Sequence, residues 1–363
     1  MELEFRPFNA EEELREQREL FSDSFPEAVG TSIESEAHYR WKFKQFPSET
    51  PSHEFAVWAL QSRKMVGYYA ALPFRYSIDG ELYRCGMVCD VMTHSTARGK
   101  GIFTKIGRYA TGELEQLGVD FTSGYPIRPE VIPGHLKVGW QIARQLPMYI
   151  KVLDSSPLIT HSLLKLCAPV SNLVFSLLSW GTRSRQRLSS KECLKLQEVN
   201  EFISESDQAY KRFFETWAQE NPVHLVKDKD FLTWRLNAPD TLYSALSLWS
   251  GDEIQGLAIL RFADLRGVPA VAILDLMILS ASANRIGVLL REIEIFGRKK
   301  GAAVIALMAS TSAARCYKII RHGFLRTPFV FKLILKPLSE RAKQHLMNKI
   351  ELFNVMWIDS DDL

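Results

Sequence analysis

The chain has 363 residues, of which 46% are hydrophobic and 24% charged, and its 45 Lys and Arg side chains against 42 Asp and Glu side chains leave a net charge of +3. A globular protein of two or three domains is therefore expected, and wholesale disorder, a fibrous repeat and a strongly basic nucleic-acid-binding protein are excluded. The five cysteines are an odd number without the paired spacing of metal ligands, so neither a disulfide scaffold nor a structural zinc is expected.

The first 150 residues are predicted to form a sheet of short strands followed by a helix, a strand and a second helix. Apolar runs separated by turn signals predict strands over residues 55–60, 65–72, 76–78, 82–84 and 87–93. Asp79-Gly80 suits a type I′ turn, which joins two of these strands into a hairpin. Apolar side chains at helical spacing predict a helix over residues 102–117, ended by Gly118. A strand over residues 119–123 and a second helix complete the unit.

Four short landmarks recur in the second half of the chain in the same order. Each copy has a tryptophan followed by a basic residue, an apolar stretch around a glycine, an apolar strand with an aspartate, and a closing Gly-aromatic pair. The landmarks are Trp41, Gly67, Asp90 and Gly139 in the first copy and Trp234, Gly256, Asp275 and Gly323 in the second. This order indicates an internal repeat. The two tryptophans are interpreted as core anchors rather than as substrate platforms.

The repeat predicts four parts, which are residues 1–150, a linker at 151–198, a second copy at 199–337 and a C-terminal helix and acidic tail at 338–363. The linker holds an apolar stretch over residues 158–180 and then a basic run over residues 183–187. Polar residues interrupt the stretch, so a helix packed on a domain is preferred to a membrane span, with a peripheral membrane contact as the alternative. The acidic tail is interpreted as a solvated, mobile terminus.

Each copy therefore contains antiparallel hairpins followed by a strand, a helix, a strand and a helix. This order predicts an α+β fold of mixed α/β layers, in which each copy is a mixed, mostly antiparallel sheet flanked by helices. The first residues lack the apolar core of a signal peptide and the cysteines are few, so a cytoplasmic protein is expected. Nothing in the sequence indicates an oligomeric state.

The stretch between the strand over residues 87–93 and the next helix carries the clearest chemical signal. It reads Arg98-Gly99-Lys100-Gly101-Ile102-Phe103-Thr104. The first N–H groups of a helix have no partner inside the helix, and the helix dipole adds partial positive charge there. The glycines let the backbone approach an anion closely, and Arg98 and Lys100 add charge at the rim. The stretch is therefore predicted to bind a pyrophosphate, although it matches neither the dinucleotide-binding nor the Walker A pattern.

Together with the strand before it, this stretch resembles the acyl-CoA signature of the GNAT superfamily of N-acyltransferases, Arg/Gln-x-x-Gly-x-Gly/Ala. Arg98 and Gly101 match the signature, whereas Phe103 occupies its last small position. Gly139-Trp140 resembles the Gly-Phe pair after the family's last helix, so the resemblance extends over the first copy. The doubled unit is similar to the tandem members of the superfamily.

The resemblance implies an acyl-CoA co-substrate, no metal, and direct transfer of the acyl group to an amine. The pantetheine arm would lie against the backbone of Val91, Met92 and Thr93, and an N–H group near Met92 or Thr93 would stabilise the thioester oxyanion. The second copy has Ser280 to Gly287 at the matching place, without the Gly-x-Gly arrangement. It is therefore expected not to bind CoA.

Three residues are candidates for proton transfer. Asp90 is the preferred base, and the alternative is that its carboxylate has a structural role. Asp275 recurs at the equivalent place in the second copy, which lacks the pyrophosphate-binding stretch that we call the cradle, and this recurrence favours a partly structural role for Asp90. His135 takes the position of the tyrosine that the family often uses as the acid, and a histidine titrates near neutrality. Tyr125 is the second candidate for the acid.

The resemblance thus implies an acyl-CoA-dependent N-acyltransferase, in the first place an N-acetyltransferase that uses acetyl-CoA and a small-molecule primary amine. One alternative is a longer-chain acyl donor or a lipid-like acceptor at a membrane surface. Another is a non-catalytic CoA-binding module. A nucleic-acid partner is not expected, because the overall charge is close to balance.

Overall fold

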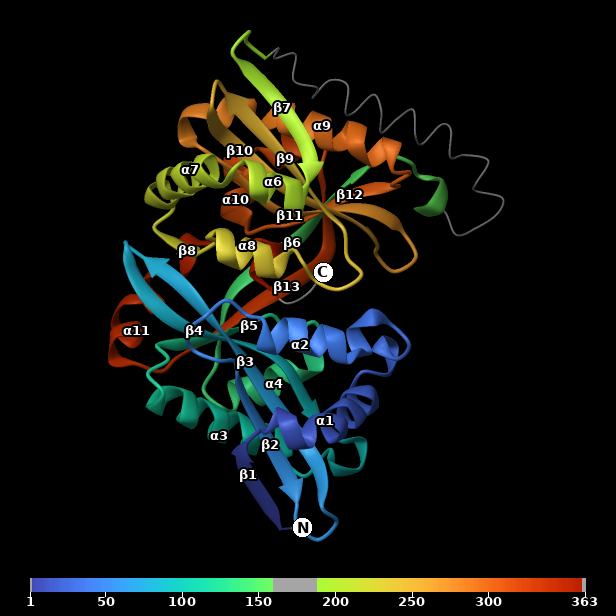
Figure 1. Cartoon of the computed structure of the whole chain (residues 1–363), viewed down its shortest axis with the longest axis vertical. Coiled ribbons are helices and arrows are strands. Elements are labelled where there is room, and N and C mark those ends of the chain that lie inside the picture. The colour runs from blue at the N-terminus through green and yellow to red at the C-terminus, as the bar shows by residue number, and fades with distance from the viewer. Residues whose placement is uncertain (1, 159–187, 361–363) are drawn as a thin grey trace.

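The computed structural model describes residues 2–158 and 188–360. Two copies of an α/β unit lie end to end, the first coloured blue to green and the second yellow to red (Figure 1). Within the described residues, a single 14-stranded sheet runs through both copies. The predicted class of mixed α/β layers is therefore confirmed.

The first copy forms one half of the sheet and has helices on both of its faces. Its strands are β1 (Leu3–Pro7), β2 (His53–Ala59), β3 (Lys64–Ile78), β4 (Glu81–Thr93), β5 (Phe121–Gly124) and β6 (Gln141–Val152). Its helices are α1 (Ala10–Ser24), α2 (Glu36–Lys44), α3 (Ile102–Gln116) and α4 (Ile132–Leu136). Asp79 and Gly80 have φ angles of 53° and 84°, as the predicted type I′ turn requires. Gly118, at φ 75°, follows the end of α3 as predicted.

The second copy repeats this arrangement and adds the C-terminal segment. Its strands are β7 (Glu192–Glu198), β8 (Val223–Leu225), β9 (Tyr243–Ser250), β10 (Glu253–Asp264), β11 (Pro269–Ile278), β12 (Val304–Met308), β13 (Leu325–Pro337) and β14 (Phe353–Asn354). Its helices are α6 (Val199–Glu205), α7 (Asp207–Glu220), α8 (Lys229–Arg235), α9 (Ile286–Lys299), α10 (Thr311–Cys316) and α11 (Glu340–His345).

The two copies exchange their last strands. The main path of the sheet runs β1-β2-β3-β4-β5-β13-β6-β12-β11-β10-β9-β7. Strand β13 pairs antiparallel with β5 of the first copy, β6 pairs antiparallel with β12 of the second, and β13 and β6 pair with each other. The order is therefore the same from either end, as an approximate two-fold axis between the copies would produce. Each copy is completed by a strand of the other.

A stacked pair of tryptophans joins the copies a second time. The rings of Trp41 and Trp234 have centroids 5.3 Å apart and planes 12° apart. Trp41 Nε1 donates to the carbonyl of Trp234 at 2.7 Å, and Trp234 Nε1 donates to the carbonyl of Trp41 at 2.9 Å. Both side chains are buried, so their prediction as core anchors is confirmed. Stacking and two buried hydrogen bonds fix how the copies meet.

The C-terminal segment folds back over both copies. Ser339 and Arg341, at the start of α11, bind the carboxylate of Asp120 in the first copy. The prediction of a solvated acidic tail is wrong for Asp359, which is fully buried beside Lys227, because the ammonium group compensates the buried carboxylate.

The rest of that tail, Asp361 and Asp362, lies outside the described residues, as does the linker from residue 159 to 187 with its apolar stretch and basic run. Among residues 2–158 and 188–360, no helix has the length and apolar character that crossing a membrane requires.

Candidate active site

Strands β4 and β5 separate where β5 ends. They pair in parallel from Cys85 opposite Phe121 to Val88 opposite Gly124, and β4 then continues alone on that side to Thr93. The register between β3 and β4 shifts at the same point, and Asp90 there has a φ angle of 48°. A bulge bends its strand and leaves local backbone groups outside the ladder. The sheet thus opens into a cleft beside an unpaired stretch of β4.

The cleft brings the three predicted catalytic residues together. Its volume is about 220 Å³. Asp90, Tyr125 and His135 all line it, from β4, from the segment after β5 and from α4. Most of the other lining side chains are apolar, and they include Val91 and Phe103. A mostly apolar cleft with a few convergent polar groups is typical of a small-molecule site.

The predicted cradle lies at the start of α3. Gly99 and Gly101 have φ angles of 76° and 74°, which only glycine adopts without strain. Within the described part of the chain, no hydrogen-bond partner is seen for the N–H groups of residues 99–104, whereas the N–H of Lys105 already bonds to the carbonyl of Gly101 at 3.1 Å. The amides are therefore free to bind an anion.

The cradle's two cations are exposed, and their contacts hold them at its edge. Arg98 Nε donates to the carbonyl of Thr93 at 3.3 Å, and Lys100 Nζ donates to the carbonyl of Thr96 at 3.0 Å. Because these acceptors are neutral, both side chains keep their full positive charge for a bound anion.

Asp90 has a basic partner on a neighbouring helix. Lys42 Nζ on α2 donates to Asp90 Oδ1 at 2.9 Å, and both side chains are largely buried. Asp275, at the equivalent place in β11, binds Lys227 through both carboxylate oxygens, at 3.1 and 3.0 Å. An aspartate paired with a lysine is thus common to both copies. This shared pairing supports a structural share in the role of Asp90.

His135 lies in an apolar surrounding. Its ring centroid is 5.0 Å from those of both Phe103 and Trp140, and each pair meets edge to face. Burial lowers the pKa of His135 to about 4. The imidazole is therefore neutral at neutral pH, so it carries no imidazolium proton to donate, and as a base it is weaker than an ordinary histidine.

Tyr125 lies beside a second tyrosine. Burial, and then the neighbouring Tyr125 and Asp359, raise the pKa of Tyr76 well above its ordinary value. Tyr125 itself is buried and lines the cleft. The C-terminal segment thus reaches the wall behind the cleft through Asp359.

Phe103, which departs from the family signature, is accommodated by a glycine on α4. A Cβ atom at Gly134 would lie 2.6 Å from Phe103 Cε1, closer than any real contact. The phenyl ring therefore packs where only glycine leaves room, while it still forms part of the cleft wall. The sequence contains this glycine, but nothing in its spacing indicates that it faces Phe103.

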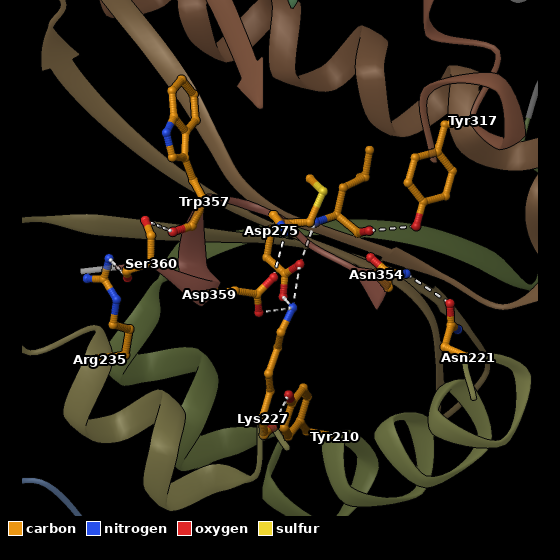
Figure 2. Close-up of polar contacts among 12 residues, drawn as sticks. Tyr210, Asn221, Lys227, Arg235, Asp275, Tyr317, Asn354, Trp357, Asp359 and Ser360 are labelled. Carbon is orange, nitrogen blue, oxygen red and sulfur yellow. Dashed lines mark hydrogen bonds and ion pairs between the residues drawn. The ribbon is translucent and has the colours of Figure 1, made fainter. Parts of the chain in front are cut away.

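The second copy lacks the features of the cradle. Its matching stretch, Ser280–Arg285, is a 3-10 helix, and Arg285 is paired with Glu192 at 2.8 Å. Tyr317 donates its hydroxyl to the carbonyl of Leu276 at 2.9 Å, on the strand equivalent to β4 (Figure 2). A side chain thus occupies the strand on which a ligand backbone would pair. This arrangement supports the prediction that the second copy does not bind CoA.

Two groups in the first-copy site could not be found from the repeat. Lys42 follows Trp41 in sequence, but only the packing of α2 carries it to Asp90. Ile334 lines the cleft although it belongs to β13, which the second copy contributes. No short-range sequence signal marks an exchanged strand, because its partners are distant in the chain.

Residues 4–143 match the family model described as an acetyltransferase (GNAT) domain. The chain is similar to a GCN5-related N-acetyltransferase from Anabaena variabilis, at 14% identity over 93% of this chain and 73% of that one, with a TM-score of 0.63.

It is similar to a probable N-acyltransferase from Enterococcus faecalis, at 11% identity over 93% of this chain and 73% of that one, with a TM-score of 0.62. It is also similar to Saccharomyces cerevisiae N-myristoyltransferase with bound myristoyl-CoA, at 9% identity over 92% and 79% of the two chains, with a TM-score of 0.58. At such identities the likeness concerns the fold alone. No curated protein sequence matches the chain.

Proposed function

We propose that the chain is an acyl-CoA-dependent N-acyltransferase with one site, in the first copy, where residues 4–143 match the family model of an acetyltransferase (GNAT) domain. The proposal depends on the fact that a candidate anion site and a cleft with proton-transfer groups lie along the same strand. Unpartnered amides at the start of α3 lie at one end of an unpaired stretch of β4, and three groups able to transfer protons line the cleft beside that stretch.

The binding roles follow from these features. The N–H groups of residues 99–104, with Arg98 and Lys100 at the rim, would hold the pyrophosphate of CoA. The edge of Val91, Met92 and Thr93 that faces away from β3 would hold the pantetheine arm as an added strand, and an N–H group at Met92 or Thr93 would bind the thioester oxygen. The cradle and the unpaired backbone suit this elongated ligand better than a compact one.

The chemical step is an attack of a neutral amine on the thioester carbonyl. A C–N bond forms, the C–S bond breaks, one proton leaves the amine and the thiolate is released or protonated. Tyr125 is the better candidate for protonating the thiolate, because His135 is neutral at working pH. His135 and Asp90 are the candidates for the amine proton. The Lys42 partner of Asp90 makes that carboxylate the less free of the two.

The size of the cleft favours a short acyl group. About 220 Å³ is below the range of about 300–1,000 Å³ that pockets for larger ligands have, and the pantetheine arm must share this space. We therefore propose acetyl-CoA as the donor and a primary amine of a small molecule as the acceptor. The myristoyl-CoA bound to the yeast neighbour makes a longer-chain donor the second candidate.

The test is a thiol-release assay with acetyl-CoA and with a long-chain acyl-CoA, each against pooled small amines. We expect release with acetyl-CoA, and a loss of about a hundredfold in kcat for Tyr125→Phe with an unchanged Kd for CoA. Tyr109→Phe on α3 removes a hydroxyl outside the cleft and is the matched control. CoA binding without thiol release on any amine would instead indicate a binding module.

A further inference from the structure

The second copy has a hollow at the place that corresponds to the candidate active site. The first-copy cleft lies after β5 and includes α4 and Ile334 of the exchanged strand β13. The second-copy hollow lies after β12 and includes α10 and Tyr149 of the exchanged strand β6. Its volume is about 490 Å³. Both sites lie after the corresponding strand and beside an exchanged strand, but no residue of β11, the equivalent of β4, lines the hollow, and the chemistry of its lining is different.

Four basic side chains surround this hollow. They are Arg315, Lys318, Arg321 and Arg326, and no carboxylate is among the lining residues. All four are exposed, and within residues 2–158 and 188–360 none of them forms an ion pair. Other exposed cations of the chain do have acidic partners, among them Arg40, Arg75 and Arg341. Like charges placed together without counter-charges indicate a site for an anion.

Two further observations support an anion site. Burial, and then the charges of Lys151 and Lys318, lower the pKa of His322, so the local potential is positive. Lys318 has a φ angle of 51°, in the left-handed region that side chains with a Cβ avoid. This conformation is a common way to end a helix, here α10, and the turn that it makes places Lys318 at the hollow.

Apolar side chains lie beside the four cations. Ile320 lines the hollow and is 64% exposed, and Leu325, next to Arg326, is 46% exposed. Phe329 is 48% exposed, on the irregular stretch of β13 that follows Arg326. A free inorganic anion gains nothing from these groups, whereas a lipid surface offers an apolar phase next to its phosphates.

We propose that this hollow binds the phosphate headgroup of an anionic phospholipid and places the second copy on a membrane surface. We call this site the basic hollow. Each of its four cations is expected to raise the partition coefficient onto an anionic membrane about fivefold. The exposed apolar side chains enter the interface beside the headgroup. The inference concerns the second copy and does not depend on acyl transfer in the first.

The test is sedimentation of the full chain with vesicles of phosphatidylcholine alone and of phosphatidylcholine with phosphatidylglycerol. We expect binding only to the mixed vesicles, weakened by raised salt. Arg315→Ala/Arg321→Ala should lower the partition coefficient about 25-fold, at about fivefold for each charge. The matched control, Lys211→Ala/Arg212→Ala, removes two exposed cations of α7 and should change binding less than about twofold.

Two more variants separate the source of the phosphate and guard against misfolding. Lys318→Asn removes the charge and keeps a residue that tolerates the left-handed region, so a loss of binding in this variant is not a folding defect. Ile320→Ser/Phe329→Ser should weaken vesicle binding while leaving its salt dependence unchanged.

Absence of binding to the mixed vesicles would overturn the proposal, as would retention by a nucleic acid in place of vesicles. Binding of inorganic phosphate that the Arg315→Ala/Arg321→Ala variant abolishes, without vesicle binding, would assign the hollow to a free anion instead. Vesicle binding that the Arg315→Ala/Arg321→Ala variant leaves intact would also overturn it. The sequence at residues 159–187 is the same in every variant, so any loss is assigned to the basic hollow.

Discussion

Replacement of Gly101 by alanine tests the cradle directly. Gly101 has a φ angle of 74°, and a Cβ built there meets nothing closer than Thr104 Oγ1 at 3.9 Å. Alanine therefore clashes with no protein atom, but it must either hold a strained left-handed backbone, at about 1–2 kcal/mol, or relax it. Relaxation would turn the neighbouring N–H groups away from the pyrophosphate.

The expected effect on binding is large compared with the effect on stability. Loss of one or two hydrogen bonds to a charged group, at about 1.5 kcal/mol each, corresponds to about a tenfold to hundredfold rise in the Kd for CoA. The melting temperature should fall by only about 2–4 °C. Isothermal titration with CoA and thermal unfolding measure the two quantities.

Gly301 supplies a matched control. It has the same φ angle of 74°, no atom within 4 Å of a built Cβ, and a place after α9 in the second copy. Gly301→Ala should lower the melting temperature equally and leave CoA binding unchanged. If the two variants bind CoA within about twofold of each other, the cradle does not hold the pyrophosphate.

Three further predictions concern buried groups. The pKa of His135 is lowered to about 4 from 6.5, so its contribution to stability is present above pH 6.5 and is lost as the pH falls toward 4. His38, whose pKa is also lowered to about 4, adds a loss of its own. In urea unfolding, the loss of stability between about pH 7.5 and pH 5 should therefore be about 2 kcal/mol smaller in His135→Gln than in the unchanged chain. Lys227→Met leaves two carboxylates buried without their counter-charge and should lower the free energy of unfolding by about 3–5 kcal/mol. A second change, Asp275→Asn, should recover part of this loss. Equal stability of the single and double variants would contradict this reasoning. Gly134→Ala should push Phe103 into the cleft and weaken CoA binding, and Phe103→Ala in the same chain should restore it, as titration of the single and double variants would reveal.

Lys227 forms a buried polar cluster with two carboxylates in the second copy. Lys227 Nζ lies 3.0 Å from Asp275 Oδ2 and 3.2 Å from Asp359 Oδ1, and all three side chains point into one buried space (Figure 2). Burial acts to lower the pKa of Lys227, but the two carboxylates outweigh it and raise the pKa. The cluster therefore fixes the C-terminal segment on β11 by charge rather than by apolar contact alone.

Local features of the fold were predictable from short stretches of sequence. The type I′ turn at Asp79-Gly80, the end of α3 before Gly118 and the glycine positions of the cradle all depend on backbone angles that glycine or an Asp-Gly pair adopts readily. The repeat was visible because each copy must bury the same kind of apolar strands. Its tryptophans and aspartates therefore recur in the same order.

The remaining features required the folded chain. Which strand completes each half of the sheet is decided by pairing between β13 and β5 and between β6 and β12, residues far apart in sequence. Such pairing has no local signal, and for the same reason Lys42 beside Asp90 and Ile334 in the cleft could not be foreseen. The tail residue Asp359 is the clearest case. The acidic composition of the tail suggested a solvated terminus. Only the ammonium group of Lys227, which the segment between β8 and α8 brings to Asp359, makes the burial of that carboxylate favourable.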